Sequence, residues 1–126
     1  MKKPIKKPDT LALAKDVAAA ADDIQAIDLK ILDMRKLSSF TDFFIIASGN
    51  SDRQVEAIAH SIIDQLKKKG RSPIGVEGLG RSQWVLVDFG DVVAHIFYHQ
   101  LRNFYALDKL WSDAKRVRVP KQRNKK

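Results

Sequence analysis

Cysteine is absent from the chain of 126 residues, which excludes disulfides, thiolate nucleophiles and cysteine-based zinc sites. Long hydrophobic runs are also missing, since no apolar stretch approaches the roughly 20 residues needed to span a bilayer. The lysine-rich N-terminal segment is not followed by the apolar stretch that a secretory signal requires. These absences favour a cytoplasmic protein without a membrane anchor.

The net charge of the chain is +8, and acidic residues are absent from both of its ends. Four lysines lie within residues 1–8 and seven Lys or Arg within 115–126, whereas residues 9–114 hold 12 Lys and Arg against 15 acids. We therefore predict a basic arm (1–8), a single folded domain (9–114) and a basic, disordered tail (115–126). Such arms either contact RNA phosphates or only aid solubility.

Two segments have the pattern of amphipathic helices. The first begins at a cap formed by Asp9 or Thr10 and ends near residue 23. The second begins after Ser51, where Gln54 completes a capping box, and Gly70 ends it. A third helix, rich in aromatic residues, is expected over 101–111.

Alternating or continuous apolar runs between these helices predict strands. They cover residues 27–33, 43–47, 73–76, 83–89 and 92–98. The run at 43–47 is apolar throughout, as in a strand covered on both faces, and Pro73 assigns its strand to a sheet edge. The element order mixes hairpins with crossovers, so we expect an α/β (α+β) fold with a mixed sheet of about five strands packed by helices.

The turn at Gly90-Asp91 fixes the register of the last hairpin. One of its faces is wholly apolar. On the other face the expected cross-strand pairs are Trp84 with Phe97, Leu86 with His95 and Asp88 with Val93. This mixture of aromatic and polar groups is typical of a binding hot spot, unless a helix buries Trp84 and Phe97. The acidic balance of the domain favours a basic protein as the partner.

No catalytic or metal-binding constellation emerges from the sequence. Asp88-Phe89-Gly90 matches a kinase string, but the chain is too short for the remaining kinase motifs. The glycines of GVEGLGR lack the Lys-Ser/Thr of a phosphate-binding loop. His60, His95 and His99 do not have the spacing of a zinc site. We therefore predict a non-enzymatic protein with no catalytic residue, metal or cofactor.

Four long segments, in order, resemble the signature blocks of the Iojap/RsfS family of ribosomal silencing factors. They are TDFFIIASGNSDRQVEAIAHSI (41–62), GVEG (75–78), WVLVDFGDVVAHIF (84–97) and RNFYALDKLW (102–111). The resemblance extends over roughly residues 10–114 and implies a nucleotidyltransferase-like fold without a transferase role. It also implies a factor that binds the large ribosomal subunit through ribosomal protein L-fourteen. The bound factor obstructs the small subunit and lowers translation when nutrients are scarce.

Positions that match the family blocks imply a partner-binding patch. We expect contacts from Trp84, Leu86, His95 and Phe97, charge pairing by Asp88 and Asp91, and a rim at Arg102 and Tyr105 unless these two only support the last helix. Ala94 stands where the family more often has valine, and it should affect packing alone. The same patch would also suit a homodimer.

Two other functions remain open from the sequence. A plain RNA-binding module would bind free RNA through the basic tails. A relic nucleotidyltransferase would bind nucleotides through acids such as Asp42, Asp52 or Asp88, although paired carboxylates for two metal ions are not evident.

Overall fold

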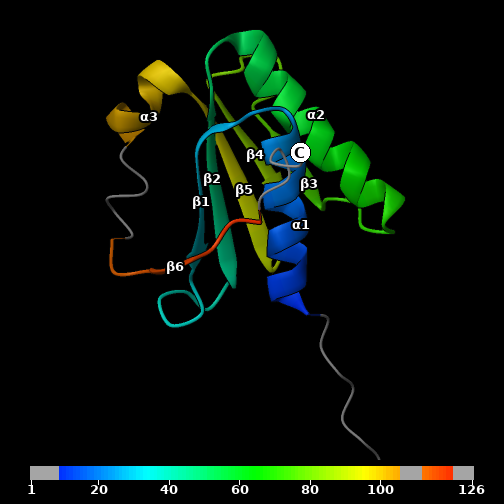
Figure 1. The fold of residues 1–126 in the computed structure, drawn as a ribbon, viewed down its shortest axis with the longest axis vertical. Helices are drawn as coiled ribbons and strands as arrows, with labels where there is room; N and C mark the ends of the chain where they lie inside the picture. Colours follow the sequence, from blue (N-terminus) through cyan, green and yellow to red (C-terminus); the bar gives the residue numbers. More distant parts are fainter. Residues whose placement is uncertain (1–8, 106–111, 121–126) are drawn as a thin grey trace, which may run out of the picture.

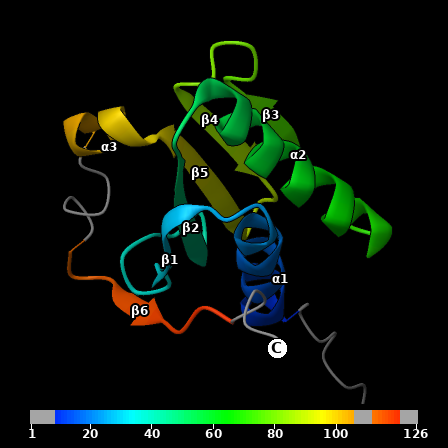
Figure 2. The ribbon, with the colours of Figure 1, turned by 45° about the horizontal axis from the view of Figure 1, so that its top comes forward.

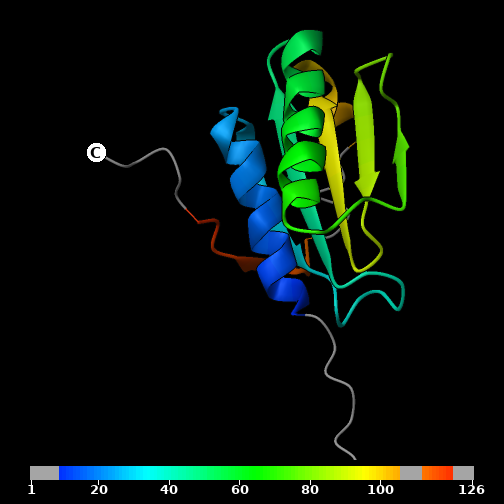
Figure 3. The ribbon, with the colours of Figure 1, turned by 90° about the vertical axis from the view of Figure 1, so that its right-hand side faces the viewer.

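The computed structural model describes residues 9–105 and 112–120. Its elements are α1 (Thr10–Asp23), β1 (Ile27–Asp33), β2 (Phe43–Gly49), α2 (Asp52–Lys68), β3 (Gly75–Glu77), β4 (Trp84–Asp88), β5 (Val92–Tyr98), α3 (His99–Tyr105) and β6 (Lys115–Val117). The strands form one sheet of six, in the order β3-β4-β5-β2-β1-β6 (Figure 1). Helices α1 and α2 lie on the same face of this sheet (Figure 3).

The predicted mixed α+β sheet is confirmed. Strands β2 and β5 pair in parallel, whereas every other neighbouring pair is antiparallel. A parallel pair needs a crossover, and α2 with the β3-β4 hairpin provides it. The structure has one strand more than the five that we predicted.

Helix α2 starts and stops where its sequence signals predict. The Ser51 hydroxyl accepts a hydrogen bond from the Gln54 amide at 3.1 Å, and Gly70 adopts a φ of 84° that ends the helix. The side chain of Gln54 accepts from the Asn50 amide at 2.7 Å and donates to the Ile24 carbonyl at 3.0 Å. Gln54 therefore caps α2 and also ties its start to the end of α1.

Helix α1 is capped by Asp9, whose carboxylate accepts from the amides of Leu11 and Ala12 at 3.1 and 3.2 Å. Four of its alanines, Ala14, Ala18, Ala20 and Ala21, are buried against α2 and the sheet, because a methyl side chain lets the helix approach closely. An apolar core fills the space between the two helices and the sheet. Its largest contributors include Val17, Ile31, Ile45, Ile58, Ile62 and Ile96.

The predicted hairpin of β4 and β5 is confirmed residue for residue. Trp84 pairs with Phe97, and the register continues without a break to Asp88 and Val93. Gly90 has a φ of 90°, which suits glycine at the first position of the tight turn. Ala94 faces the helices and is fully buried, so it belongs to the packing side as expected.

The alternation that we predicted for β1 fails at its first residue. A bulge separates Ile27 from Lys30, and Asp28 within it has a φ of 50°. Ile27 pairs with Ser48 and Lys30 with Ile46, so both point to the face opposite the helices. Residues 29 and 31 keep their place on the helix side.

The predicted disordered tail is wrong for its first residues. Lys115 to Val117 form β6, where Val117 pairs with Ile31 of β1. Val117 and Val119 pack against the helix-side core, and the alternation of valine with basic residues explains this amphipathic strand. Residues 121–126 and 106–111 lie outside the described residues, so only the α3 part of the predicted third helix is observed. Within the described ranges, no helix is long and apolar enough to cross a membrane.

Candidate protein-docking face

The sheet face opposite α1 and α2, called the second face below, carries the hairpin residues that the sequence marked. Strand alternation places three residues of β4 there, Trp84, Leu86 and Asp88, which we call the β4 strip. All three side chains are half-buried. Phe44 of β2 lies on the same face, because it is in register with Val93 of β5. The second face is therefore partly apolar and still accessible along β4.

Four rings form an aromatic cluster on this face, namely Phe44, Trp84, His95 and Phe97. The ring centroids of Phe44 and His95 lie 4.6 Å apart in an edge-to-face arrangement, and those of Trp84 and Phe97 lie 5.2 Å apart. These spacings fall within the favourable range for aromatic pairs, each contributing about 0.5–1.5 kcal/mol beyond simple burial. The cluster holds Trp84 in place before any partner arrives.

His95 has an unusual environment within the aromatic cluster. The Trp84 indole N–H donates to its Nδ1 atom at 3.1 Å, so the neutral ring carries its proton on Nε2. Burial lowers the pKa of His95 to about 4, which keeps the ring neutral at physiological pH. The buried Nε2 atom finds no acceptor among the described residues. Such an unsatisfied donor costs about 1–3 kcal/mol, a cost that native structures rarely carry without a reason.

A shallow hollow of about 270 Å³ lies at the outer edge of the β4 strip. It is lined by Glu77, Gly78, Trp84 and Leu86. Its apolar floor is bordered by the Glu77 carboxylate, and Asp88 continues the acidic edge along β4. A hollow of this composition suits an apolar side chain presented by a basic surface.

The loop between β3 and β4 fixes the position of Trp84. Gly78 has a φ of 91°, and a Cβ atom there would come within 2.1 Å of the Trp84 carbonyl oxygen. The Glu56 carboxylate of α2 accepts from the Gly80 amide at 2.9 Å and from the Ser82 hydroxyl at 2.6 Å. Our sequence reasoning missed Glu56 and Ser82, because only the glycines of this loop gave a signal.

The acidic residues of the predicted patch lie at the turn of the hairpin. Asp88 accepts from the Gly90 amide at 2.7 Å, so it also holds the turn. Asp91 is exposed, and its carbonyl accepts from the Thr41 hydroxyl at 3.0 Å. Asp88 ends the β4 strip, and Asp91 follows it in the turn before β5.

Three predicted contact residues are buried in the isolated chain, which corrects their assignment. The exposed fractions are 0% for Phe97, 6% for His95 and 5% for Arg102. Phe97 and His95 pack beside the β4 strip, on the neighbouring strand β5. Arg102 is no rim residue, since its guanidinium donates to the Ser48 hydroxyl at 2.9 Å. The side chain of Tyr105 lies outside what the structure describes.

The acids suggested for nucleotide binding do not converge. Asp42 precedes β2 and accepts from the Thr10 hydroxyl at 2.8 Å, whereas Asp52 follows β2 at the start of α2. The strand between them has seven residues, a length of about 23 Å. In residues 9–105 and 112–120, no three His, Asp or Glu side chains gather as a metal site would need.

Comparison with known proteins gives consistent matches. The family model described as "Ribosomal silencing factor during starvation" matches residues 7–126. The Bacillus subtilis protein "Ribosomal silencing factor RsfS" is 48% identical over 103 residues, covering 82% of this chain and 87% of that relative. A mouse protein named "Mitochondrial assembly of ribosomal large subunit protein 1" is 34% identical over 90 residues, or 69% of this chain and 40% of the mouse protein.

A solved structure of a Chromobacterium violaceum protein has the same fold. It matches with a TM-score of 0.81 and 35% sequence identity, covering 94% of this chain and 98% of that chain. The family model also reaches residue 126. Residues 115–126 therefore lie within the matched region, whereas the resemblance found in the sequence covered only residues 10–114.

Proposed function

The chain belongs to the RsfS family of ribosomal silencing factors, and from this premise we propose that it binds the large ribosomal subunit through ribosomal protein L-fourteen and blocks association with the small subunit. It thereby represses translation in the cytoplasm when nutrients are limiting. The family description refers to starvation, and the mouse relative is named for the large subunit. The first name supports the nutrient condition, and the second supports the large subunit as the partner.

The β4 strip is the observation that carries the proposal. Trp84 and Leu86 offer an apolar anchor site, while Glu77, Asp88 and Asp91 place negative charge around it. Aromatic anchors surrounded by polar groups dominate the binding energy of most protein interfaces. Acidic groups at the rim favour a basic partner and speed its encounter, as expected for a ribosomal protein.

The silencing step requires no chemistry from this chain. A domain of about 100 residues has a radius of gyration near 13 Å, so a docked copy fills space that the small subunit would need. Because the sheet, the aromatic cluster and the pinned β3-β4 loop are already in place, little conformational entropy is lost on binding. We propose that a homodimer formed through the same strip would compete with docking.

Pelleting with separated large and small ribosomal subunits tests the proposal. We expect capture by the large subunit alone, and a loss of affinity of at least about tenfold in Trp84→Ala. Trp84→Phe keeps most of the ring packing and should lose less. His60→Ala, on the exposed side of α2, is the matched control and should bind like the wild type. Thermal melting of each variant separates lost binding from lost folding.

Two further measurements separate the parts of the proposal. Direct binding to purified L-fourteen tests the partner, and light scattering of mixed subunits tests the block of subunit association. Capture by both subunits, or by neither, would contradict the docking proposal. Capture by the large subunit with undisturbed subunit joining would remove the silencing step and leave only the docking.

A further inference from the structure

Phe40 is the most exposed large apolar side chain in the described part of the chain, at 90%. It lies in the loop between β1 and β2. The hydroxyl of Ser38 accepts hydrogen bonds from the amides of Phe40 and Thr41 at 3.0 and 3.3 Å, and the Met34 amide donates to the Asp42 carbonyl at 2.7 Å across the base of the loop. A structured loop thus displays an aromatic ring to solvent. The fold itself gains nothing from this ring.

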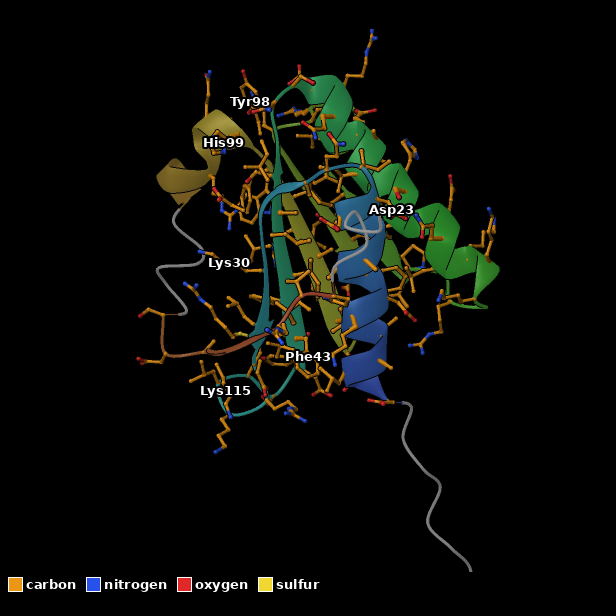
Figure 4. The ribbon with its side chains drawn as sticks, in the orientation of Figure 1. Asp23, Lys30, Phe43, Tyr98, His99 and Lys115 are labelled. Atoms are coloured by element: carbon orange, nitrogen blue, oxygen red, sulfur yellow. The ribbon has the colours of Figure 1, made fainter. Side chains whose placement is uncertain are left out.

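A hollow of about 650 Å³ lies against the same loop. The loop lines it with Arg35, Lys36 and Leu37, and the segment entering β6 lines it with Asp113 and Lys115. Figures 1 and 2 both show β6 beside the β1-β2 loop, and Figure 4 labels Lys115 at this place. The hollow therefore joins two segments that are about 80 positions apart in sequence.

The charge around this hollow is mainly positive. Arg35 binds the Asp33 carboxylate through two nitrogens at 3.0 and 2.7 Å, which lowers the pKa of Asp33 and cancels its charge locally. With Lys36 and Lys115, the lining has three cations against the two carboxylates of Asp33 and Asp113. The exposed Arg116 and Arg118 extend the positive charge along and just beyond β6. We call the loop, the hollow and residues 115–118 the basic edge.

The basic edge and the β4 strip stand at opposite sides of one rigid sheet. The strand order β3-β4-β5-β2-β1-β6 separates the Glu77 and Asp88 carboxylates from Lys115 by most of its width. Ala114 lines the hollow and also packs on the buried residues of the second face, which connects the two regions. A single docked orientation can therefore present both to one large assembly.

We propose that the basic edge is an RNA-binding surface, in which Lys36, Lys115 and Arg116 contact phosphates and Phe40 stacks on an unpaired base. This inference rests on the proposed function, because a large ribosomal subunit offers RNA beside its proteins. Cations next to an exposed aromatic ring are the usual elements of single-stranded RNA binding. A lipid surface would require a broader apolar face than Phe40 and Leu37 provide.

The salt dependence of binding to large subunits tests the role of the cations. The double variant Lys115→Gln/Arg116→Gln should bind roughly tenfold more weakly at low salt, with a slope of log affinity against log salt less steep by about 1.5. Lys67→Gln/Lys68→Gln is the matched control, because it removes the same charge from the exposed end of α2. Equal slopes for the two double variants would overturn the proposal.

The ring of Phe40 is tested separately. Phe40→Ala should weaken binding at least about fivefold without changing the salt slope, since stacking involves no counterion release. Ile74→Ala removes another exposed apolar side chain, 75% accessible, and should have no effect. Equal affinities for Phe40→Ala and Ile74→Ala would argue against stacking. Neither side chain is buried, so folding is not at risk.

Photo-cross-linking identifies the partner of the basic edge. A benzophenone amino acid in place of Phe40 should cross-link to ribosomal RNA in complexes with large subunits. Cross-links to ribosomal protein alone, or binding of the wild type to phosphatidylserine vesicles without cross-links to RNA, would overturn the inference. If subunits do not capture the wild type, the proposed function fails. Filter binding of the same variants to purified large-subunit RNA then decides the inference alone, since equal retention of all variants would reject it.

Discussion

The two faces of the sheet differ in what they bury. The helix side buries a large apolar cluster contributed by α1, α2 and the four strands β1, β2, β4 and β5. Among the residues that the structure describes, the second face encloses four apolar residues, Leu32, Met34, Ile46 and Phe97, together with the polar Ser48, His95 and Arg102. The difference indicates that the helix side provides stability, whereas the second face gives up some stability to keep a particular surface.

Truncation on the helix side should have the largest effect on stability. Ile62 of α2 is fully buried, so Ile62→Ala should lower the free energy of unfolding by about 2–5 kcal/mol through lost burial and a residual cavity. Urea denaturation followed by circular dichroism measures it. A loss below about 1 kcal/mol would mean that α2 is packed far less tightly than the structure shows.

The buried imidazole should make stability depend on pH. Because burial depresses the pKa of His95 from 6.5 to about 4, the unfolded chain takes up a proton first as the pH falls. The stabilisation is complete above about pH 6.5 and is lost between that pH and about 4, by roughly 3 kcal/mol in total.

Denaturation curves at several pH values check this titration. The variant His95→Gln can still accept a hydrogen bond from Trp84 but does not titrate, so its stability should fall less over the same range. Other acids titrate in both proteins, and the difference between them isolates His95. Parallel curves for the two proteins would show that the imidazole does not titrate as proposed.

A methyl group added at Gly78, which packs against the backbone of Trp84, should affect both stability and docking. Gly78→Ala forces a Cβ atom against the Trp84 carbonyl oxygen at a φ of 91°, and we expect a loss of about 1–3 kcal/mol. Gly80→Ala is the matched control, because its φ is 96° but no atom lies within 4 Å of the added Cβ. Thermal melting of the two variants separates the clash from the backbone strain.

The smallest effect on stability is expected at the β4 strip. Leu86 is half-buried, so Leu86→Ala should cost about 1 kcal/mol of stability while weakening capture by the large subunit about tenfold. Pelleting and melting of the same preparation give both numbers. A stability loss as large as that of Ile62→Ala, with unchanged docking, would remove the distinction between the two faces.

Local signals predicted the elements that depend on local chemistry. Ser51, Gln54 and Gly70 defined α2, and the Gly90-Asp91 turn gave the complete register of the hairpin. The mixed sheet followed from the order of these elements. The side chains that share a face with Trp84 were predicted correctly, because the pairing of β4 with β5 determines them.

Features that depend on distant contacts were not predictable in this way. The charge of residues 115–126 concealed the valine alternation that makes β6, and a bulge at Asp28 reversed one residue of β1. Phe97 and Arg102 were expected at the surface, but their burial depends on segments that come from elsewhere in the chain. Glu56 had no sequence signal, because its role is to hold a loop 24 positions away.

Both outer strands of the sheet are short. β3 and β6 have three residues each, and two of the three residues of β6 are basic. Unpaired strand edges are templates for the growth of a sheet from one molecule to the next, and short or charged edges prevent it. The molecule is thereby protected against cross-β aggregation, and any association with itself or with others is directed to its faces and loops.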